Sequence, residues 1–518
     1  MLYRRHLLAI SVLALLALLI TLIPVYPNDL WWHMRSGEEI VQGRPIPTID
    51  TYSFTGYGRA FVYSGWASQA LLYLLHYLGG ASLLVVARNV LVTGAYLLAL
   101  VGAAKRSQSW LVAALLILWS GLFSVEFWHI RPQIFGYLPF VALLFVMLGF
   151  ADGRLRARWL LAAPLATIIW TNVHGAFTLA PIIATLIAGS VTLQWLKQRD
   201  RRSGVRSVML LWTTVAGVAL AMLVNPWGFG ITDSVRTLLT DQAIQMFVVE
   251  WQPPHPGGIF RNLFFSSILL SIAAFGLSRR RPTLAEIFVF GALVWQAWTA
   301  SRFIVWYGLA WPMLVAPSVA GLLPQARSRR PTPEIGWLNL GLALALIGLP
   351  LSQQPGSPFR RWLPDAYRAA LIAEPGGEPL LIKSTPVGAV AYLQAHPLPA
   401  NARLFNETGA GSYLIWAWRD GRVFVDPRYT TQPLQVWLDY RQIVTGCGYN
   451  TLLGRYAITH ALVDQQEQRG LAAALAADTG WRRLWSDASS ALYERTDAPP
   501  SEPPCQPAPA NSEQQHSG

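Results

Sequence analysis

The chain has 518 residues, of which 53% are hydrophobic and only 13% are charged, whereas a soluble globular protein carries roughly 25% charged residues. This composition excludes an ordinary soluble protein and indicates a chain that lies largely in lipid. The net charge of +13 does not indicate a nucleic-acid partner, because the basic residues form short clusters between apolar runs and no continuous basic face.

Apolar runs of the length that a helix needs to cross a bilayer recur between residues 7 and 351. They predict about eleven transmembrane helices, near residues 7–25, 82–102, 109–125, 134–150, 159–172, 176–195, 207–224, 262–277, 284–299, 303–322 and 336–351. The first run follows MLYRRH and lacks a small-residue cleavage site, so it is predicted as an uncleaved span. The segment ASQALLYLLHYLGG, residues 67–80, is too short to span and is expected as a helix in the membrane interface.

Every second loop between these runs is basic. The clusters are Arg4 and Arg5 and the segments 105–106, 154–158, 197–206, 279–281 and 327–330. Because loops rich in Lys and Arg stay in the cytoplasm, we expect a multi-pass protein of the plasma (inner) membrane with a cytoplasmic N-terminus. An odd number of spans then places the C-terminal part of the chain outside the cytoplasm.

The predicted domains differ in composition. Residues 1–353 are predicted as a transmembrane domain with a first outer loop at 27–66. Residues 354–496 alternate strand-like runs (ARLFNET, SYLIWAW, RVFVDPR) with helical runs (TPVGAVAYLQAH, GLAAALAADTG), which predicts a soluble extracytoplasmic α/β domain. Residues 497–518 are rich in Pro, Ser, Glu and Gln and are predicted as a disordered tail.

Two outer loops place a carboxylate beside a histidine and an arginine at the membrane boundary. The residues are Asp29, His33 and Arg35 in NDLWWHMR, and Glu126, His129 and Arg131 in EFWHIRPQ. A carboxylate in a medium of low dielectric constant has a raised pKa and suits a general base, and ionisable residues at membrane depth are functional hypotheses. The alternative for both loops is an interfacial segment whose polar side chains are merely solvated.

Further polar residues are candidates for substrate binding. In the outer loops they are Asn172, His174, Glu250 and Arg302, and at the ends of predicted strands Asn406, Tyr413, Asp426 and Arg428. Arg131 and Arg302 together suit a lipid-linked phosphate or diphosphate, which guanidinium groups bind with paired hydrogen bonds. For Asp426 and Arg428 a structural ion pair is the alternative, and a lone histidine such as His174 is more often structural.

The first outer loop resembles that of the GT-C superfamily of membrane glycosyltransferases, in particular the catalytic subunits of oligosaccharyltransferases. The matching stretch is NDLWWHMRSGEEIVQGRPIPTIDTYSFTGYGR, with an acidic residue, two aromatic residues, His-x-Arg, a Pro-rich turn and Asp-x-Tyr. The chain also resembles a group of bacterial GT-C-like proteins that share RPQ, N-x-H-G and a late VFVDPR segment. Two features depart from the oligosaccharyltransferase pattern: Glu126 alone stands where a second acidic pair is expected, and the tryptophan-rich acceptor motif is absent.

The resemblance implies a GT-C glycosyltransferase that takes a sugar from a polyprenyl-phosphate or polyprenyl-diphosphate carrier. Asp29 is then the base or the residue that orients the acceptor, with His33, Glu126 and His129 as further catalytic candidates. The expected partners are a lipid-linked sugar donor, membrane lipids and a glycan, lipid or protein acceptor. The cofactor is open: a divalent cation, Mg²⁺ or Mn²⁺, would use Asp29 and Glu126. The alternative function is a multi-pass transporter or flippase, but no half-to-half repeat is visible and the polar residues cluster at span ends.

Overall fold

The computed structural model of the chain describes residues 4–26, 28–197, 204–324, 336–354 and 380–499, and it divides into two compact units. The first unit comprises Met1–Ile23, Ser82–Thr232 and Val249–Trp362. The second comprises Pro24–Ala81, Asp233–Val248 and Leu363–Gly518, so the first outer loop and the C-terminal part of the chain belong to one unit. Predictions for the basic segments 198–203 and 327–330 and for the tail from residue 500 lie outside the described residues.

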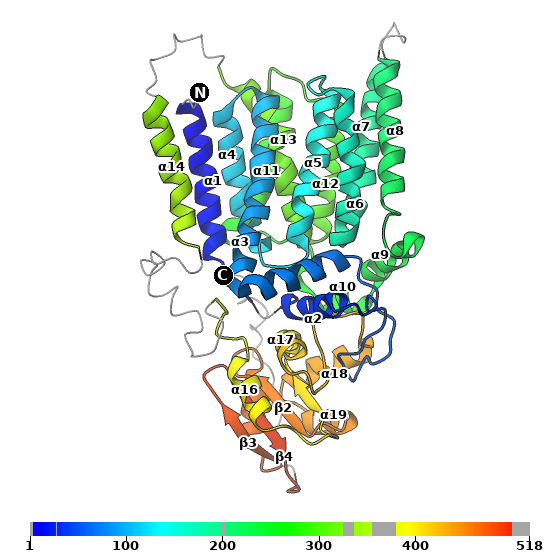
Figure 1. The fold of residues 1–518 in the computed structure, drawn as a ribbon, viewed down its shortest axis with the longest axis vertical. Helices are drawn as coiled ribbons and strands as arrows, with labels where there is room; N and C mark the ends of the chain where they lie inside the picture. Colours follow the sequence, from blue (N-terminus) through cyan, green and yellow to red (C-terminus); the bar gives the residue numbers. More distant parts are fainter. Residues whose placement is uncertain (1–3, 27, 198–203, 325–335, 355–379, 500–518) are drawn as a thin grey trace. The chain divides into compact units, whose positions relative to one another are not determined.

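The first unit is a set of helices that run side by side (Figure 1). They are α1 (Arg4–Leu22), α3 (Trp66–Ser107, from Ser82 on), α4 (Trp110–Ser124), α5 (Gln133–Ala151), α6 (Ala162–Val173), α7 (Leu179–Leu196), α8 (Val205–Ala221), α11 (Gly258–Leu277), α12 (Leu284–Thr299), α13 (Ile304–Leu322) and α14 (Gly336–Ser352).

Each predicted span coincides with one of these helices, which confirms a helical membrane protein. Among the described residues, six helices are long and apolar enough to cross a membrane, and four more are apolar but shorter. Helix α6 has only 12 residues. The number of membrane crossings therefore stays a prediction.

Helix α13 is the central element of this unit. Its side chains from Ile304 to Ser318 are all buried, and it packs against α4, α5, α11 and α12. Gly308 permits the close approach to α4, because a Cβ there would lie 2.4 Å from the Ser124 hydroxyl. In lipid, where apolar surface drives helix association weakly, such close packing and buried hydrogen bonds hold helices together.

Charged side chains join three loops at one end of the first unit. Arg106 forms ion pairs with Asp152 (2.8 Å) and Glu286 (2.9 Å), and Arg280 pairs with Glu286 at 2.8 Å. Three of the predicted basic loops therefore lie at the same end of the helices, as an alternating topology requires. The cytoplasmic location of that end stays a prediction.

The second unit contains a mixed sheet surrounded by helices. Its elements are α2 (Leu30–Val41), the start of α3, α10 (Gln242–Phe247), α16 (Val387–Ala395), β1 (Leu404–Asn406), α17 (Thr408–Ala417), α18 (Leu434–Val444), α19 (Tyr449–Arg455), β2 (His460–Asp464), α20 (Arg469–Ala477), β3 (Trp481–Ser486) and β4 (Ser490–Arg495). Helix α9 (Ile231–Thr240) begins at the boundary of the two units. The strand order is β1-β2-β4-β3, with β1 and β2 parallel and the other two pairs antiparallel.

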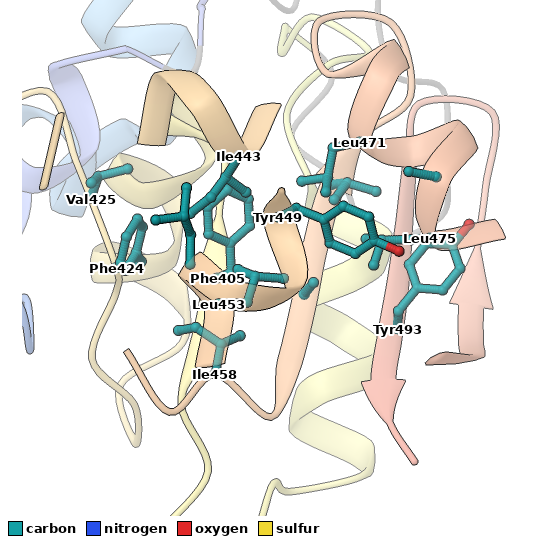
Figure 2. Packing of buried hydrophobic residues seen from close by; sticks show 14 of the residues in the cluster. Phe405, Phe424, Val425, Ile443, Tyr449, Leu453, Ile458, Leu471, Leu475 and Tyr493 are labelled. Carbon is teal, nitrogen blue, oxygen red and sulfur yellow. The ribbon is translucent and has the colours of Figure 1, made fainter. Parts of the chain in front are cut away.

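A hydrophobic core lies between this sheet and α18, α19 and α20 (Figure 2). Phe405 of β1 and Tyr493 of β4 contribute from the sheet, and Ile443, Tyr449 and Leu471 contribute from the helices. Burying a large apolar side chain contributes roughly 1.5–3 kcal/mol, so this core is sufficient to organise a small unit.

The first outer loop joins this sheet region through the backbone. The N–H of Val423 donates to the carbonyl of Tyr52 at 3.0 Å, and the N–H of Phe54 donates to the carbonyl of Val423 at 3.1 Å. Trp32 of α2 packs in a second core cluster with Leu414. The loop is therefore an integral part of the second unit.

Two of the strand predictions for residues 354–496 are wrong. SYLIWAW lies mainly in helix α17, because the Glu407 side chain caps the helix by accepting the N–H of Ala410 at 2.7 Å. RVFVDPR forms no strand; only Val423 makes an isolated bridge. The strand in ARLFNET and the two helical predictions are confirmed by β1, α16 and α20.

The expected helix over residues 67–80 is present as the first part of α3. The helix is broken at Gly79 and Gly80, and Gly80 has φ +59°, which a residue with a side chain rarely adopts. Its location in a membrane interface stays a prediction.

Candidate functional site

Two short turns at one end of the first unit hold an acidic and a basic residue that are distant in sequence. Glu250 lies in the 3₁₀ turn η5 (Val249–Trp251) and Arg302 in η6 (Ser301–Phe303). Ser301 fastens the turns together: its N–H donates to the carbonyl of Gln252 at 3.0 Å and its hydroxyl to the carbonyl of Glu250 at 3.2 Å. The Arg302 guanidinium lies 4.6 Å from the centre of the Trp251 ring, which fixes its position by a cation–π contact.

Arg131 reaches the same place from the loop before α5. It forms an ion pair and a hydrogen bond with Glu250, and both side chains are partly buried. Burial alone would raise the pKa of Glu250, but the charges of Arg131 and Arg302 outweigh it and lower the pKa to about 2. Glu250 is therefore ionised at neutral pH and is a poor proton acceptor in this arrangement.

His174 lies at the end of α6, in an extended conformation that begins the turn η3 (Gly175–Thr178). Its Nδ1 accepts the N–H of Ala176 at 3.1 Å, so the neutral ring carries its proton on Nε2. The ring stacks on Trp306 with centroids 5.8 Å apart. Burial and the charge of Arg302 lower the pKa of His174 to about 3, although Glu250 opposes this shift.

His129 is electrostatically coupled to the same cluster. Burial and the charges of Arg131 and Arg88 lower its pKa to about 3, against the opposing effect of Glu250. Both histidines are therefore neutral at pH 7, and a neutral imidazole donates a hydrogen bond from one ring nitrogen and accepts one at the other.

These five residues form one cluster, which we call the arginine site: His129, Arg131, His174, Glu250 and Arg302. The two arginines outnumber the single carboxylate, so the site carries a net positive charge with two neutral imidazoles. This combination of charges suits an anion such as a phosphate, which would compete with Glu250 for the guanidinium of Arg131.

Two predicted site residues of the first unit have other contacts. Glu126 forms an ion pair with Arg261 at 2.8 Å, and the Asn172 amide donates to the carbonyls of Ile168 (2.9 Å) and Val224 (2.7 Å). Within the described ranges, no three His, Cys, Asp or Glu side chains come together as metal ligands. The divalent cation that the sequence leaves open at Asp29 and Glu126 stays a prediction.

Arg88 of α3 was not predicted as a site residue. Its guanidinium is fully buried and donates to the carbonyls of Ile20 (2.7 Å) and Ile23 (2.8 Å) at the end of α1. Its charge also acts on His129. The sequence carries the signal, because an arginine inside the apolar run 82–102 is expensive in lipid and marks a functional or buried position.

The predicted residues of the first outer loop lie in the second unit. Asp29 is partly exposed at the N-terminal end of α2. His33 is buried and its Nδ1 lies 3.2 Å from the Gln69 amide nitrogen, while its ring packs on Tyr63. Arg35 pairs with Glu38 at 2.8 Å. Asp29 and His33 therefore differ in exposure, and their catalytic roles stay predictions.

The predicted residues of the C-terminal segment are mostly buried. Arg428 forms ion pairs with Asp426 and with Asp50 of the first loop, both at 2.7 Å, and all three side chains are almost fully buried. This is the arrangement of a structural ion pair, the alternative that the sequence leaves open. The side chain of Asn406 is likewise used within the unit, since it accepts the N–H of Phe424 at 2.7 Å. The Tyr413 ring packs edge-on against Trp31.

No protein-family model and no curated protein matches the chain. Among solved structures, the chain is similar to the archaeal oligosaccharyltransferase AglB from Archaeoglobus fulgidus in complex with an inhibitory peptide and a dolichol-phosphate, with 14% identity, TM-score 0.49, and coverage of 95% of this chain and 75% of that one. It is also similar to ArnT from Cupriavidus metallidurans bound to undecaprenyl phosphate, with 14% identity, TM-score 0.46, and coverage of 94% and 97%. ArnT in the apo state gives 15% identity, TM-score 0.45, and coverage of 93% and 96%.

The first of these structures is by its name an oligosaccharyltransferase, the kind of enzyme whose first outer loop this chain's loop resembles. At these identities the similarity concerns the path of the backbone alone.

Proposed function

We propose that the chain is a membrane glycosyltransferase that moves a sugar from a polyprenyl-phosphate-linked donor to an acceptor on the extracytoplasmic face. The observation that carries the proposal is the arginine site, where Arg131 and Arg302 surround Glu250. A net positive cluster at helix ends suits a phosphate whose lipid chain remains in the bilayer.

In this proposal the two arginines bind the donor phosphate and stabilise the charge that develops on it. The bond between the sugar's anomeric carbon and the phosphate oxygen breaks, and the phosphate leaves with the electron pair. An acceptor hydroxyl or amide attacks the anomeric carbon and gives up its proton. Stabilising the leaving group's charge in a site of low dielectric constant is the largest contribution that such residues make to catalysis.

The proton acceptor that we propose is Asp29, on the strength of the resemblance of its loop. Glu250 is unsuited to that role because its pKa is held at about 2. His129 and His174 are neutral and, with pKa values of about 3, are weak bases too, so we propose that they hydrogen-bond to the sugar hydroxyls.

Glycolipid and glycan mass spectrometry of a deletion strain tests the proposal. Cells without the protein are expected to accumulate the sugar-loaded lipid carrier and to lack one glycan. Complementation with Asp29→Asn is expected to leave that glycan absent although the protein is inserted, whereas Asp233→Asn, a change of an exposed aspartate on α9, is expected to restore it. A normal glycan profile with Asp29→Asn would remove Asp29 from the mechanism.

The deletion strain also distinguishes a glycosyltransferase from the alternative function, a transporter or flippase. A strain without a flippase would accumulate the loaded carrier on the cytoplasmic leaflet, where a membrane-impermeant sugar-oxidising reagent does not reach it. A strain without the transferase would accumulate it on the outer leaflet, where the reagent does.

A further inference from the structure

The second unit contains an open cleft of about 730 Å³. No residue of the arginine site lines it. One wall is formed by the first outer loop, at α2 and residues 51–54, and the other by residues 393–403 and 415–422. The charged side chains that line the cleft are Arg35, Arg403, Arg419, Arg422, Glu39 and Asp420. Glu38 pairs with Arg35 and Arg419, so the four guanidinium groups meet three carboxylates, and the excess positive charge lies at Arg403 and Arg422.

We propose that this cleft binds an acidic saccharide, a glycan of a few sugar residues that carries carboxylate or phosphate groups. The proposal does not depend on the glycosyltransferase activity, because the residues concerned are separate from the arginine site.

Two of the four guanidinium groups are paired with carboxylates, and the other two are oriented by aromatic rings. Glu38 forms ion pairs with Arg35 at 2.8 Å and with Arg419 at 3.0 Å, and Arg35 also lies 3.5 Å from Glu39. Arg422 lies over the Tyr57 ring at 4.2 Å, and Arg403 lies over the Phe54 ring at 5.4 Å.

Arg403 also donates one N–H to the carbonyl of Tyr456 at 3.0 Å. Within the described part of the chain, neither Arg403 nor Arg422 has a carboxylate partner. Each therefore has donors to spare for an anion, and each is already oriented by an aromatic ring.

The base of the cleft is rigid because it rests on buried charges. The Tyr52 hydroxyl donates to Glu39 at 2.9 Å, and its ring lies 4.9 Å from the guanidinium carbon of Arg428. Arg428 is in turn fixed by Asp50 and Asp426. The structural ion pair described above thus supports the cleft wall.

The chemistry of the walls favours a saccharide over the other anionic ligands. A charged lining excludes an acyl chain, and the volume lies within the range of about 300–1,000 Å³ that small-molecule sites occupy. Pro397 and Pro399 lack backbone N–H groups, so this wall is poorly suited to pair with an extended peptide. Glu39 and Asp420 accept hydrogen bonds from hydroxyl groups, which a saccharide has in excess.

Binding measurements on the full chain in lipid nanodiscs test the proposal. We expect trigalacturonate, an acidic trisaccharide, to bind, and neutral maltotriose to bind at least about tenfold more weakly, because each charge-assisted hydrogen bond contributes about a factor of ten or more. Glucose 6-phosphate tests whether the cleft binds phosphate as well as carboxylate groups. If it competes with trigalacturonate, phosphate binds the same guanidinium groups; if it does not compete, the cleft binds carboxylates only.

The double variant Arg403→Gln and Arg422→Gln is expected to weaken trigalacturonate binding about tenfold to hundredfold. Arg469→Gln, which changes an exposed arginine of the same unit outside the cleft, is expected to leave it unchanged. Size-exclusion elution at the wild-type volume shows that the variants are folded. Equal affinities for the acidic and neutral trisaccharides, an unchanged affinity of the folded double variant, or tighter binding of triglutamate than of trigalacturonate would overturn the proposal.

Discussion

Replacing either member of the Arg131–Glu250 pair by a neutral residue of similar size is expected to change the affinity for phosphate. The affinity should fall when Arg131 is replaced and rise when Glu250 is replaced. Arg131→Gln removes a guanidinium that binds the donor phosphate. A charge-assisted hydrogen bond contributes about 1.5–3 kcal/mol, so the dissociation constant for a polyprenyl phosphate is expected to rise about tenfold to hundredfold.

Glu250→Gln removes the carboxylate that competes with the phosphate for Arg131. The pair is partly exposed, with side-chain exposures of 22% and 30%. Its contribution is therefore nearer that of a surface ion pair, about 1 kcal/mol, and binding is expected to tighten by about fivefold.

The assay is displacement of a fluorescent polyprenyl phosphate from the purified protein at fixed ionic strength. Arg236→Gln, on α9 and outside the cluster, is the matched control, because it lowers the net charge equally. If both Arg131→Gln and Glu250→Gln weaken binding by similar factors, the pair only maintains the structure of the turns and the phosphate-binding role of Arg131 is wrong.

Three further predictions concern the residues around this pair and the second unit. Arg302→Gln is expected to weaken polyprenyl phosphate binding about tenfold. The free energy of unfolding is expected to fall by about 1 kcal/mol at most, which is the contribution of the lost cation–π contact. Unchanged binding would contradict the role of Arg302. The lowered pKa values of His129 and His174 mean that the unfolded chain binds more protons between pH 3 and 6.5, so each histidine is expected to reduce stability by about 2 kcal/mol at pH 5 relative to pH 8. Thermal unfolding at the two pH values checks this, and His174→Gln should lose part of the difference. Asp426→Asn removes one of the two carboxylates that neutralise the buried guanidinium of Arg428, and it is expected to destabilise the second unit by about 3–5 kcal/mol. An unaltered rate of limited proteolysis would show that the ion pair is dispensable.

The helices of the first unit could be predicted from apolar run length, because a backbone in lipid must satisfy its own hydrogen bonds. The same rule does not operate in the second unit. SYLIWAW is a short apolar run whose period does not distinguish helix from strand, and the cap from Glu407 decides for the helix. The antiparallel pair β3 and β4 was not predicted, because WRRLWS and SALYER do not alternate clearly.

The residues of the candidate site could be named, but their partners could not. Arg131 and Glu250 were both candidates, although 119 positions separate them and no local pattern joins them. Conversely, Asp426 and Arg428 follow a segment that resembles a strand end, and only the packing reveals that their charges are buried together. Asp50, their third partner, comes from the first outer loop, so the ion pair depends on the tertiary fold.

We propose that this chain breaks the bond between a sugar and a polyprenyl phosphate carrier. The most direct measurement is the release of free polyprenyl phosphate from a radiolabelled polyprenyl-phosphate sugar by the reconstituted protein. Release is expected to depend on an acceptor and to fall at least about tenfold with Arg131→Gln. The proposal would be contradicted if the intact donor moved between leaflets and was not cleaved with any of the native envelope acceptors.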